Sequence, residues 1–488
     1  MLLVVVAAFA ATDAARAEVQ LPEMIRVRLS VSGPNFRATL PDGAQLAIDD
    51  VPVSLPNGDA TLGIAPDGWR LGIPAESPVA LLAVAGAGSD DPVRSAGLFS
   101  GRNAAERARR ILRAEFGRLP EVSRTGWHIS LNASVLRESP ARIDLTPGPT
   151  APLTLNGRDY RGQLRLDPAG DGFVVTNVLL LEEYLYSVVG SEMPSTWSLE
   201  ALKAQAVAAR TYALRQISPD ADYDICDSTA CQAYGGIATE TTSVRQAVDA
   251  TSGIVATYDG QPIDAVYSAN MGGQTAAAED VWANYSPYLR PVASPFDSLA
   301  LGSGWAADDY EWTVELTPAQ LLAGLRRRGY DLTSLEAVSV IADDGFGRAV
   351  ALEIRGRPFT LTIYRDEIRY ALGIKSTVVA VSTTAEKHAR AVVGAPGIAA
   401  ERWPAGAASG GYRRSIAFEE TPEDVRLNNG SVFTRELILP ESIVLTGRGF
   451  GHGVGMSQWG AQGMALDGSD FEAILKHYFT GIELTQAG

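Results

Sequence analysis

The chain is poor in several residue types that specific functions require. Its 488 residues include two cysteines and four histidines, and 57 aspartates and glutamates outnumber 41 lysines and arginines, which gives a net charge of −16. Nucleic acid and anionic lipid need clustered basic side chains, so this charge balance argues against both as partners. The motifs GxGxxG, GxxxxGK[ST], HExxH and GxSxG are absent. The sequence therefore gives no support for nucleotide binding.

Long apolar runs are also scarce. The run from Leu2 to Ala11 is shorter than the roughly 20 residues that a transmembrane helix needs, and Ala15-Arg16-Ala17 follows as a small-x-small cleavage pattern. We therefore predict a secretory signal peptide at residues 1–17, although its positive n-region is missing; the alternative is an apolar N-terminal strand. No other stretch is long and apolar enough to span a bilayer. We expect an exported protein, in the periplasm, the cell wall or the extracellular space, without a transmembrane segment in the mature chain.

The two cysteines, Cys226 and Cys231, are separated by four residues. In an oxidising compartment this spacing favours a local disulfide over free thiols. The alternative is half of a zinc site, in which nearby aspartates would have to complete the ligand set because no histidine is close. Carboxylates suit a closed zinc site poorly, so we predict no metal and no cofactor.

Composition and local patterns divide the chain into segments. Alternating apolar and polar positions between turn signals predict short strands near the N-terminus, and Asn103 opens an amphipathic helix, residues 103–116, after the apolar run 79–84. We predict a β-rich module (18–75), a small α/β module (76–139), a proline-rich linker (140–155) and one large domain (156–488) with an irregular insertion at about 383–435.

The large domain mixes helix and strand signals. Ser198 is a good N-cap for a helix over 198–216, whose many alanines indicate that another element packs at close range. The remaining signals predict hairpins around Asp259-Gly260 and over 337–356, a strand and a helix over 312–329, and a closing helix over 471–479. Since there is no regular βαβ alternation, the predicted fold class is α+β.

Glu192 stands in a context that suits acid/base chemistry. It lies between the apolar segment Leu185–Val189 and Pro194, shortly before Trp197. Burial in apolar surroundings disfavours the charged form of a carboxyl group and raises its pKa towards the range of a general acid. The alternative is that Glu192 caps a helix or forms a salt bridge there.

Residues 447–455 carry a glycine at every second position, with His452 among them. If this stretch is extended, the glycines share one face, and a sugar or another backbone can approach closely on that side. His452 then lies on the opposite face, where it is available to bind a ligand or to orient Glu192. The alternative is a structural glycine-rich loop, packed against the alanine-rich helix, with His452 in a structural hydrogen bond.

Five further blocks of the sequence are distinctive. They are, in chain order, LEEYLYSVVGSEMPSTWSLEALKAQAVAARTYAL (181–214), YSANMGGQTAAAEDVWANYSPYLRPV (267–292), RYALGIKSTVVAV (369–381), GRGFGHGVGMSQWGAQGMA (447–465) and HYFTGIEL (477–484). Together these blocks resemble the SpoIID/LytB family, in the order in which the family has them. They span about two thirds of the chain, and their joint occurrence is specific. The helix predicted at 103–116 bears only a faint similarity to a sporulation-related repeat domain.

The resemblance implies a SpoIID-like α+β domain that acts on bacterial peptidoglycan. The implied activity is that of a lytic transglycosylase, which cleaves the MurNAc–GlcNAc bond of peptide-free glycan strands and leaves a 1,6-anhydro-MurNAc end. The family's catalytic glutamate falls on Glu192. We interpret further residues of the matching blocks as substrate-binding candidates: Tyr267, Ser268, Gly272, Gly273, Gln274, Arg448, His452, Gln458 and Trp459.

Two other functions are possible, and the family suggests the first of them. LytB-type members are regarded as enhancers of a cell-wall amidase, so the alternative is a non-catalytic protein that binds glycan strands and stimulates an amidase partner. A metallohydrolase is the third hypothesis and rests only on Cys226 and Cys231. Some clostridial relatives bind zinc in the region that corresponds to 226–232, with histidines as ligands. No histidine is close here, so the zinc is not carried over.

Overall fold

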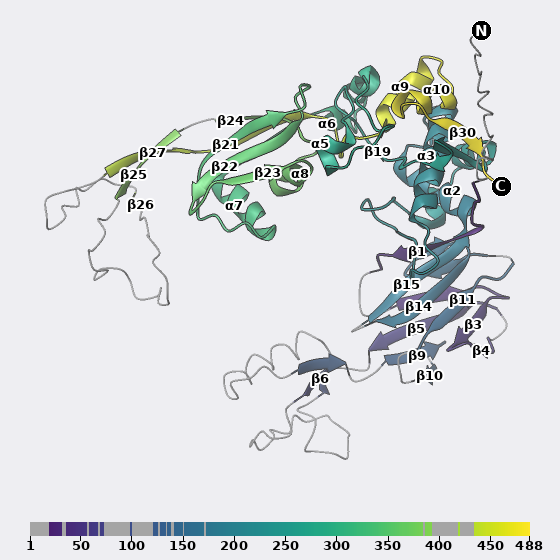
Figure 1. Ribbon diagram of the computed structural model, residues 1–488. Helices are drawn as coiled ribbons and strands as arrows, with labels where there is room; N and C mark the ends of the chain where they lie inside the picture. Colours follow the sequence, from purple (N-terminus) through teal and green to yellow (C-terminus); the bar gives the residue numbers. More distant parts are fainter. Residues whose placement is uncertain are drawn as a thin grey trace, which may run out of the picture. The chain divides into compact units, whose positions relative to one another are not determined.

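Figure 1 shows a computed structural model of the chain. The apolar run 79–84, the helix predicted at 103–116, the signal peptide predicted at 1–17 and most of the insertion predicted at about 383–435 lie outside the described residues. The structure describes residues 19–72, 98–99, 121–149, 151–392, 418–419 and 434–488, apart from short gaps at 32–35, 56–57, 67–68, 125–126, 133, 138–140, 170–171 and 384–385. These residues form two compact units, one up to Asp264 together with Glu483–Gly488, the other Ala265–Ile482.

The first unit contains two large sheets and a small one, β7-β6-β8, made of Leu98–Phe99, Trp69–Gly72 and Glu121–Arg124. Alternate residues of the large sheets are buried, and Phe36 of one meets Phe173 of the other edge-on at 6.0 Å between ring centroids. The seven-stranded sheet has the order β16 (Ile225–Cys226), β1 (Met24–Leu29), β15 (Gly172–Leu180), β14 (Gln163–Ala169), β11 (Ile143–Thr146), β3 (Gln45–Ile48) and β4 (Val51–Val53). The six-stranded sheet has the order β10 (Ser134–Arg137), β9 (Trp127–Leu131), β5 (Ala60–Pro66), β2 (Phe36–Leu40), β12 (Leu153–Leu155) and β13 (Arg158–Tyr160).

The segment 140–155, predicted as a linker, contributes strands to both large sheets. β11 pairs with β3, with Ile143 opposite Ile48, and β12 pairs with β2, with Thr154 opposite Thr39. The segment was predicted as a linker because it is rich in proline, and proline cannot donate a hydrogen bond within a sheet. However, Pro147, Pro149 and Pro152 all lie between β11 and β12, where no such hydrogen bond is lost. The N-terminal strands therefore share their sheets with strands of the predicted linker and of the segment after it.

Helices α2 (Leu181–Glu192) and α3 (Leu199–Gln216) follow β15 and lie beyond the end of the large sheets (Figure 1). The helix predicted from Ser198 is confirmed, and its buried alanines pack against α2, α4 (Thr242–Ala250) and β17 (Ile254–Tyr258). The predicted turn at Asp259-Gly260 joins β17 to β18 (Gln261–Pro262) in an antiparallel hairpin. The C-terminal strand β30 (Glu483–Gln486) pairs with the other edge of β17.

The second unit is built from smaller sheets. One core packs helices α7 (Pro318–Arg327) and α8 (Glu367–Leu372) on two three-stranded sheets. Other elements include η2 (Pro295–Gly302), α5 (Ala278–Trp282), α6 (Ala307–Tyr310), α9 (Gln458–Leu466) and α10 (Phe471–Tyr478). The sheets are β20-β28-β24 (Glu311–Leu316, Ile443–Arg448, Val378–Thr383), β21-β22-β23 (Ser334–Asp343, Ala349–Arg357, Leu361–Tyr364), β26-β25-β27 (Phe418–Glu419, Glu386–Val392, Thr434–Pro440) and the parallel pair β19-β29 (Tyr267–Ser268, Met456–Ser457).

The predicted strand and helix over 312–329, hairpin over 337–356 and closing helix over 471–479 are confirmed. β20 is followed by α7, which begins with a complete capping box between Thr317 and Gln320. β21 and β22 form the predicted hairpin, and α10 buries Ile474, Leu475 and Tyr478. The fold class is α+β, as predicted. Within the part of the chain that the structure describes, no helix combines the length and the hydrophobicity needed to cross a membrane.

Candidate functional site

The first unit places Glu192 at the carboxyl end of α2. This helix buries one face, including Tyr184, Leu185 and Val188, while its last residue, Glu192, is partly exposed. Glu192 Oε1 accepts a hydrogen bond of 2.8 Å from the backbone N–H of Ala233. The carboxyl group is therefore held by a segment that follows α2 by some 40 residues in the chain.

The segment that carries Ala233 is itself fixed on both sides. The Tyr184 hydroxyl donates to Gln232 Oε1 at 3.0 Å, and the amide of Gln232 donates to the carbonyl of Ala209 on α3. Tyr234 stacks on Tyr184 with 5.3 Å between ring centroids and donates to Asn177 Oδ1 at 2.6 Å. Burial raises the pKa of both tyrosines, so they remain protonated hydrogen-bond donors at neutral pH. Ala233 is thus a rigid donor to Glu192.

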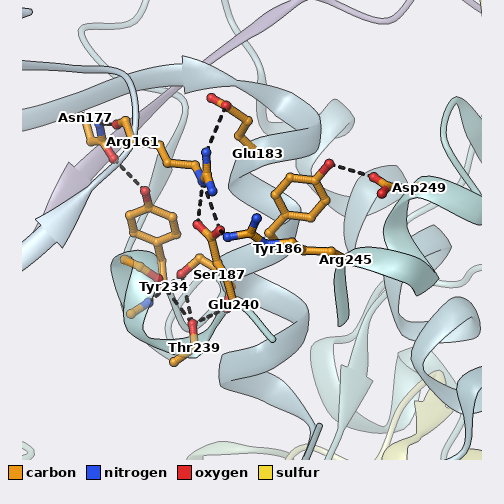
Figure 2. A network of polar contacts seen from close by, with 12 residues as sticks. Arg161, Asn177, Glu183, Tyr186, Ser187, Tyr234, Thr239, Glu240, Arg245 and Asp249 are labelled. Atoms are coloured by element: carbon orange, nitrogen blue, oxygen red, sulfur yellow. Dashed lines mark hydrogen bonds and ion pairs between the residues drawn. The ribbon is translucent and has the colours of Figure 1, made fainter. Parts of the chain in front are cut away.

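A network of charged side chains braces the same helix (Figure 2). The buried carboxylate of Glu240 accepts hydrogen bonds from Arg161 Nε and from Arg245 Nη2, both at 2.9 Å. Arg161 also forms an ion pair with Glu183 of α2. Beside this network is an open cleft of about 860 Å³, lined by residues of α4 and by Glu240. The sequence pattern did not single out Glu240, because an isolated acidic residue carries no signal of its burial.

Cys226 and Cys231 form a disulfide, as predicted. The bond occupies both sulfur atoms, so neither is available as a thiolate ligand, and no cluster of three or more metal-binding side chains occurs among the described residues. The disulfide ends directly before Gln232 and Ala233. It therefore anchors the segment that donates to Glu192.

Reduction of this disulfide is expected to lower the free energy of unfolding by about 2 kcal/mol, because it releases a short closed loop. The backbone amide of Ala233 should then exchange faster with deuterium, which peptide-level hydrogen exchange measures with and without dithiothreitol. The double variant Cys226→Ser/Cys231→Ser is the control and should resemble the reduced parent in both conditions. An Ala233 amide equally protected in all samples would show that the disulfide does not support the segment.

The second unit holds all the predicted substrate-binding residues. Tyr267 and Ser268 form β19, which runs parallel to β29, and the turn Asn270–Gly273 follows directly. Asp297 organises this turn: Oδ2 accepts from the backbone N–H groups of Met271 (3.1 Å) and Gly273 (2.9 Å). Its Oδ1 accepts from the hydroxyls of Ser294 (2.8 Å) and Ser457 (2.5 Å). One buried carboxylate thus joins the turn to the start of α9.

The glycine-rich stretch is extended only as far as Arg448, so the condition under which its glycines would share one face is not met, and the alternative of a glycine-rich loop holds beyond that residue. Beyond β28 the alternate glycines all have φ in the left-handed region, at 88°, 116°, 86° and 78° for Gly449, Gly451, Gly453 and Gly455. A Cβ atom at Gly451 would lie 2.5 Å from Cβ of Ser268, and one at Gly453 would overlap the guanidinium group of the buried Arg348. The close approach on the side of these glycines is therefore made by the protein itself.

Arg348 fills the space beside Gly453. It is fully buried and donates to the carbonyl of Met271 at 3.1 Å and to the hydroxyl of Thr377 at 3.2 Å. Burial lowers the pKa of the guanidinium group, and Asp344 acts in the opposite direction. Neither Arg348 nor Asp297 belongs to a sequence motif of the kind that identified Glu192, so sequence reasoning missed both.

His452 has its ring between backbone groups and an aromatic side chain. Its Nδ1 accepts from the N–H of Val454 at 3.0 Å, and the ring centroid lies 4.9 Å from that of Trp282. Burial lowers the pKa of His452 to about 4, although Asp366 and a backbone hydrogen bond with Tyr267 favour the charged form. At neutral pH the imidazole is therefore uncharged, with its proton on Nε2. These contacts favour the structural alternative for His452.

This pKa predicts an acid-sensitive stability. Between pH 6.5 and about 4 the unfolded chain binds a proton at His452 that the folded chain excludes, so the free energy of unfolding falls as the pH is lowered through this range. The loss is expected to reach about 3 kcal/mol near pH 4. Thermal unfolding from pH 7 to pH 4 measures it, and the variant His452→Asn should show a flatter profile. Parallel profiles of parent and variant would contradict the assignment.

The remaining candidates have different environments. Gln458 and Trp459 form the first turn of α9 and are largely buried. Arg448 is exposed at the end of β28 and lines a cleft of about 550 Å³ with residues of β20 and β24. Within the second unit, the structure thus brings β19, its following turn, His452 and the start of α9 together. Glu192 belongs to the first unit.

Comparison with known proteins places this arrangement in a family. The family model described as Stage II sporulation protein (SpoIID) matches residues 169–258, which include Glu192 and the disulfide. An uncharacterised protein of Brachyspira hyodysenteriae is 32% identical over 334 residues, covering 68% of this chain and 73% of the relative.

Two named relatives extend the match. Stage II sporulation protein D of Bacillus subtilis is 30% identical over 325 residues, covering 63% of this chain and 75% of the relative. The amidase enhancer of the same organism is 28% identical over 327 residues, covering 62% of this chain and 40% of that protein. The chain therefore belongs to the SpoIID/LytB family, the family of stage II sporulation protein D.

Proposed function

We propose that the protein is an exported lytic transglycosylase of bacterial peptidoglycan, with Glu192 as its acid/base. The observation that supports this most directly is the Glu192 carboxyl group, fixed by the Ala233 N–H at the end of α2 within the segment that matches the SpoIID family. A catalytic proton donor must be positioned before it can act. Tyr184, Tyr234 and the disulfide supply that positioning here.

One carboxyl group suffices for this reaction. In the proposed mechanism protonated Glu192 donates its proton to the glycosidic oxygen as the bond from that oxygen to C1 of MurNAc breaks, which releases GlcNAc with a free 4-hydroxyl. The C6 hydroxyl of the same MurNAc then bonds to C1, and the Glu192 carboxylate accepts the proton of that hydroxyl. No water enters and no second carboxylate is required as a nucleophile, in contrast to most glycoside hydrolases.

The reaction product tests the proposal. The purified chain would be incubated with peptide-free glycan strands, and the soluble products would be analysed by mass spectrometry. Lytic transglycosylase activity gives 1,6-anhydro-MurNAc ends, which are one water lighter than the reducing ends that hydrolysis gives. Reducing ends would instead indicate a glycosidase. The absence of released fragments would contradict both a lytic transglycosylase and a glycosidase.

The second candidate function is a non-catalytic one. One relative in the comparison is named an amidase enhancer, and on this proposal the chain binds glycan strands and stimulates a cell-wall amidase without cleaving the glycan. Co-sedimentation with the strands, together with faster release of stem peptides by an added cell-wall amidase, would support this function if no anhydro ends form.

A further inference from the structure

Trp305 presents an aromatic surface of the second unit that no sequence motif identified. It lies between η2 and α6 and is 65% exposed, although large aromatic side chains are usually mostly buried. Its ring lies against Trp459 of α9, with 5.7 Å between centroids and 34° between planes. Trp459 is only 7% exposed, and its backbone N–H donates to the carbonyl of Ala269 at 3.0 Å. An exposed indole is thus backed by a fixed one.

Charged groups border the buried indole. Trp459 donates a side-chain hydrogen bond to Asp309, a contact that lowers the pKa of this carboxyl group against the larger opposing effect of burial. The ammonium group of Lys375 lies 3.5 Å from Asp309 Oδ1 and 2.6 Å from Asp308 Oδ2. Polar hydrogen-bonding groups therefore lie directly beside the aromatic pair.

A second exposed aromatic ring, that of Phe450, lies next to Lys375. The Nζ atom of Lys375 lies 5.0 Å from the ring centroid of Phe450, which is 40% exposed, and the carbonyl of Lys375 accepts from the N–H of Gly451. Contacts between neighbouring side chains thus connect Trp305, Trp459, Asp309, Lys375 and Phe450 into one series, in which Lys375 also pairs with Asp308. These six residues are called here the Trp305 platform.

The chemistry of the Trp305 platform fits a saccharide better than a protein. A pyranose ring has an apolar C–H face, which an indole covers, and a rim of hydroxyl and amide groups, which carboxylates and an ammonium group bind. An apolar protein partner would have to remove water from Asp308, Asp309 and Lys375, which is costly for charged groups. Aromatic anchors at binding surfaces contribute a large share of affinity when they become covered.

We propose that the Trp305 platform binds a pyranose ring of a glycan strand, with Trp305 as the stacking surface and Asp308, Asp309 and Lys375 as hydrogen-bonding groups at its edge. This rests on the proposed action on glycan strands and adds a binding site for the strand. Because Trp305 is exposed and is not among the contacts of Asp297 and Arg348, we expect its replacement to leave the fold intact.

The test compares three variants of the full chain. Binding to peptide-free glycan strands would be measured by sedimentation, and release of anhydro ends would be followed on the same samples. Trp305→Ala is expected to weaken binding about tenfold, the size of effect that truncating an aromatic anchor produces, and Trp305→Phe is expected to retain most of the affinity. The control is Phe346→Ala, which removes a side chain of the second unit that is 55% exposed and outside the platform; it should bind as the parent does.

The possible results separate this proposal from the proposed function. If the parent binds the strands and releases anhydro ends, and Trp305→Ala binds within twofold of the parent, the platform is overturned while the proposed function stands. If the parent binds without releasing anhydro ends, the proposed lytic transglycosylase falls, and the platform is still judged by the loss of binding in Trp305→Ala. If the parent neither binds nor cleaves, both fall. If Trp305→Ala binds glycan normally but no longer stimulates an added amidase, the surface serves a protein partner and the saccharide assignment is overturned.

Discussion

Replacing Glu192 by glutamine is expected to slow the release of anhydro-MurNAc ends by about 10²- to 10⁴-fold, the usual contribution of a general acid/base. Glutamine keeps the size of the side chain and the oxygen that accepts from Ala233, so the end of α2 and the segment 231–235 retain their contacts. It has no proton that it can transfer to a glycosidic oxygen. Binding to the strands should remain within about twofold of the parent, because the lost proton transfer stabilises only the transition state and not the bound substrate.

The measurement pairs single-turnover cleavage of peptide-free strands with sedimentation of the same strands. Glu200→Gln is the matched control, because Glu200 is a partly exposed glutamate at the start of the neighbouring helix α3, where it pairs with Lys203 at 2.7 Å. It should cleave at the parental rate. Loss of binding together with activity in Glu192→Gln would assign Glu192 to recognition, and undiminished cleavage would exclude it as the acid/base.

Local sequence signals determined which elements could be predicted. The helix after Ser198 begins at a residue type that is common at N-caps, although the Ser198 side chain makes no capping hydrogen bond, and the hairpin at Asp259-Gly260 has a turn dipeptide. Each of these signals lies within a few residues of the chain. The order of strands in the two large sheets depends on pairings such as β3 with β11, which join residues about 95 positions apart. No local pattern specifies such a pairing, and the prolines around 147–152 obscured the strands themselves.

In the candidate site, too, local sequence signals identified some residues but not the distant residues that position them. Glu192 was identified because a motif and an apolar context surround it in the sequence. Ala233, which holds it, and Tyr234, which fixes the segment of Ala233, lie about 40 residues away, and their role depends on how the chain returns after α3. The glycines after Gly447 indicated that another group approaches the chain closely at this stretch, as it does at Gly451 and Gly453. They did not reveal that Ser268 and Arg348 make that approach, which requires left-handed backbone rather than an extended strand.

Asp297 is a buried group whose loss should strongly destabilise the second unit. Its two oxygens accept four hydrogen bonds, from two backbone N–H groups and two serine hydroxyls. Asp297→Ala leaves these donors without their acceptor in a buried site, and an unsatisfied buried donor costs about 1–3 kcal/mol. Because the serine hydroxyls can rotate to other acceptors, we expect a total loss of about 3–5 kcal/mol in the free energy of unfolding.

The variant Asp297→Asn separates hydrogen bonding from packing. Its amide oxygen can still accept from Ser294 and Ser457, whereas its NH₂ group meets the N–H groups of Met271 and Gly273 and cannot accept from them. The expected loss is about 2 kcal/mol, intermediate between parent and Asp297→Ala. Urea unfolding measures both values, with Asp331→Asn as the control, since the side chain of Asp331 is 81% exposed. Equal stability of Asp297→Ala and the parent would mean that other groups hold the turn Asn270–Gly273 against α9.

A graded loss of stability that also weakens glycan binding would link the order of this turn to recognition, because Gly272 and Gly273 within it are substrate-binding candidates.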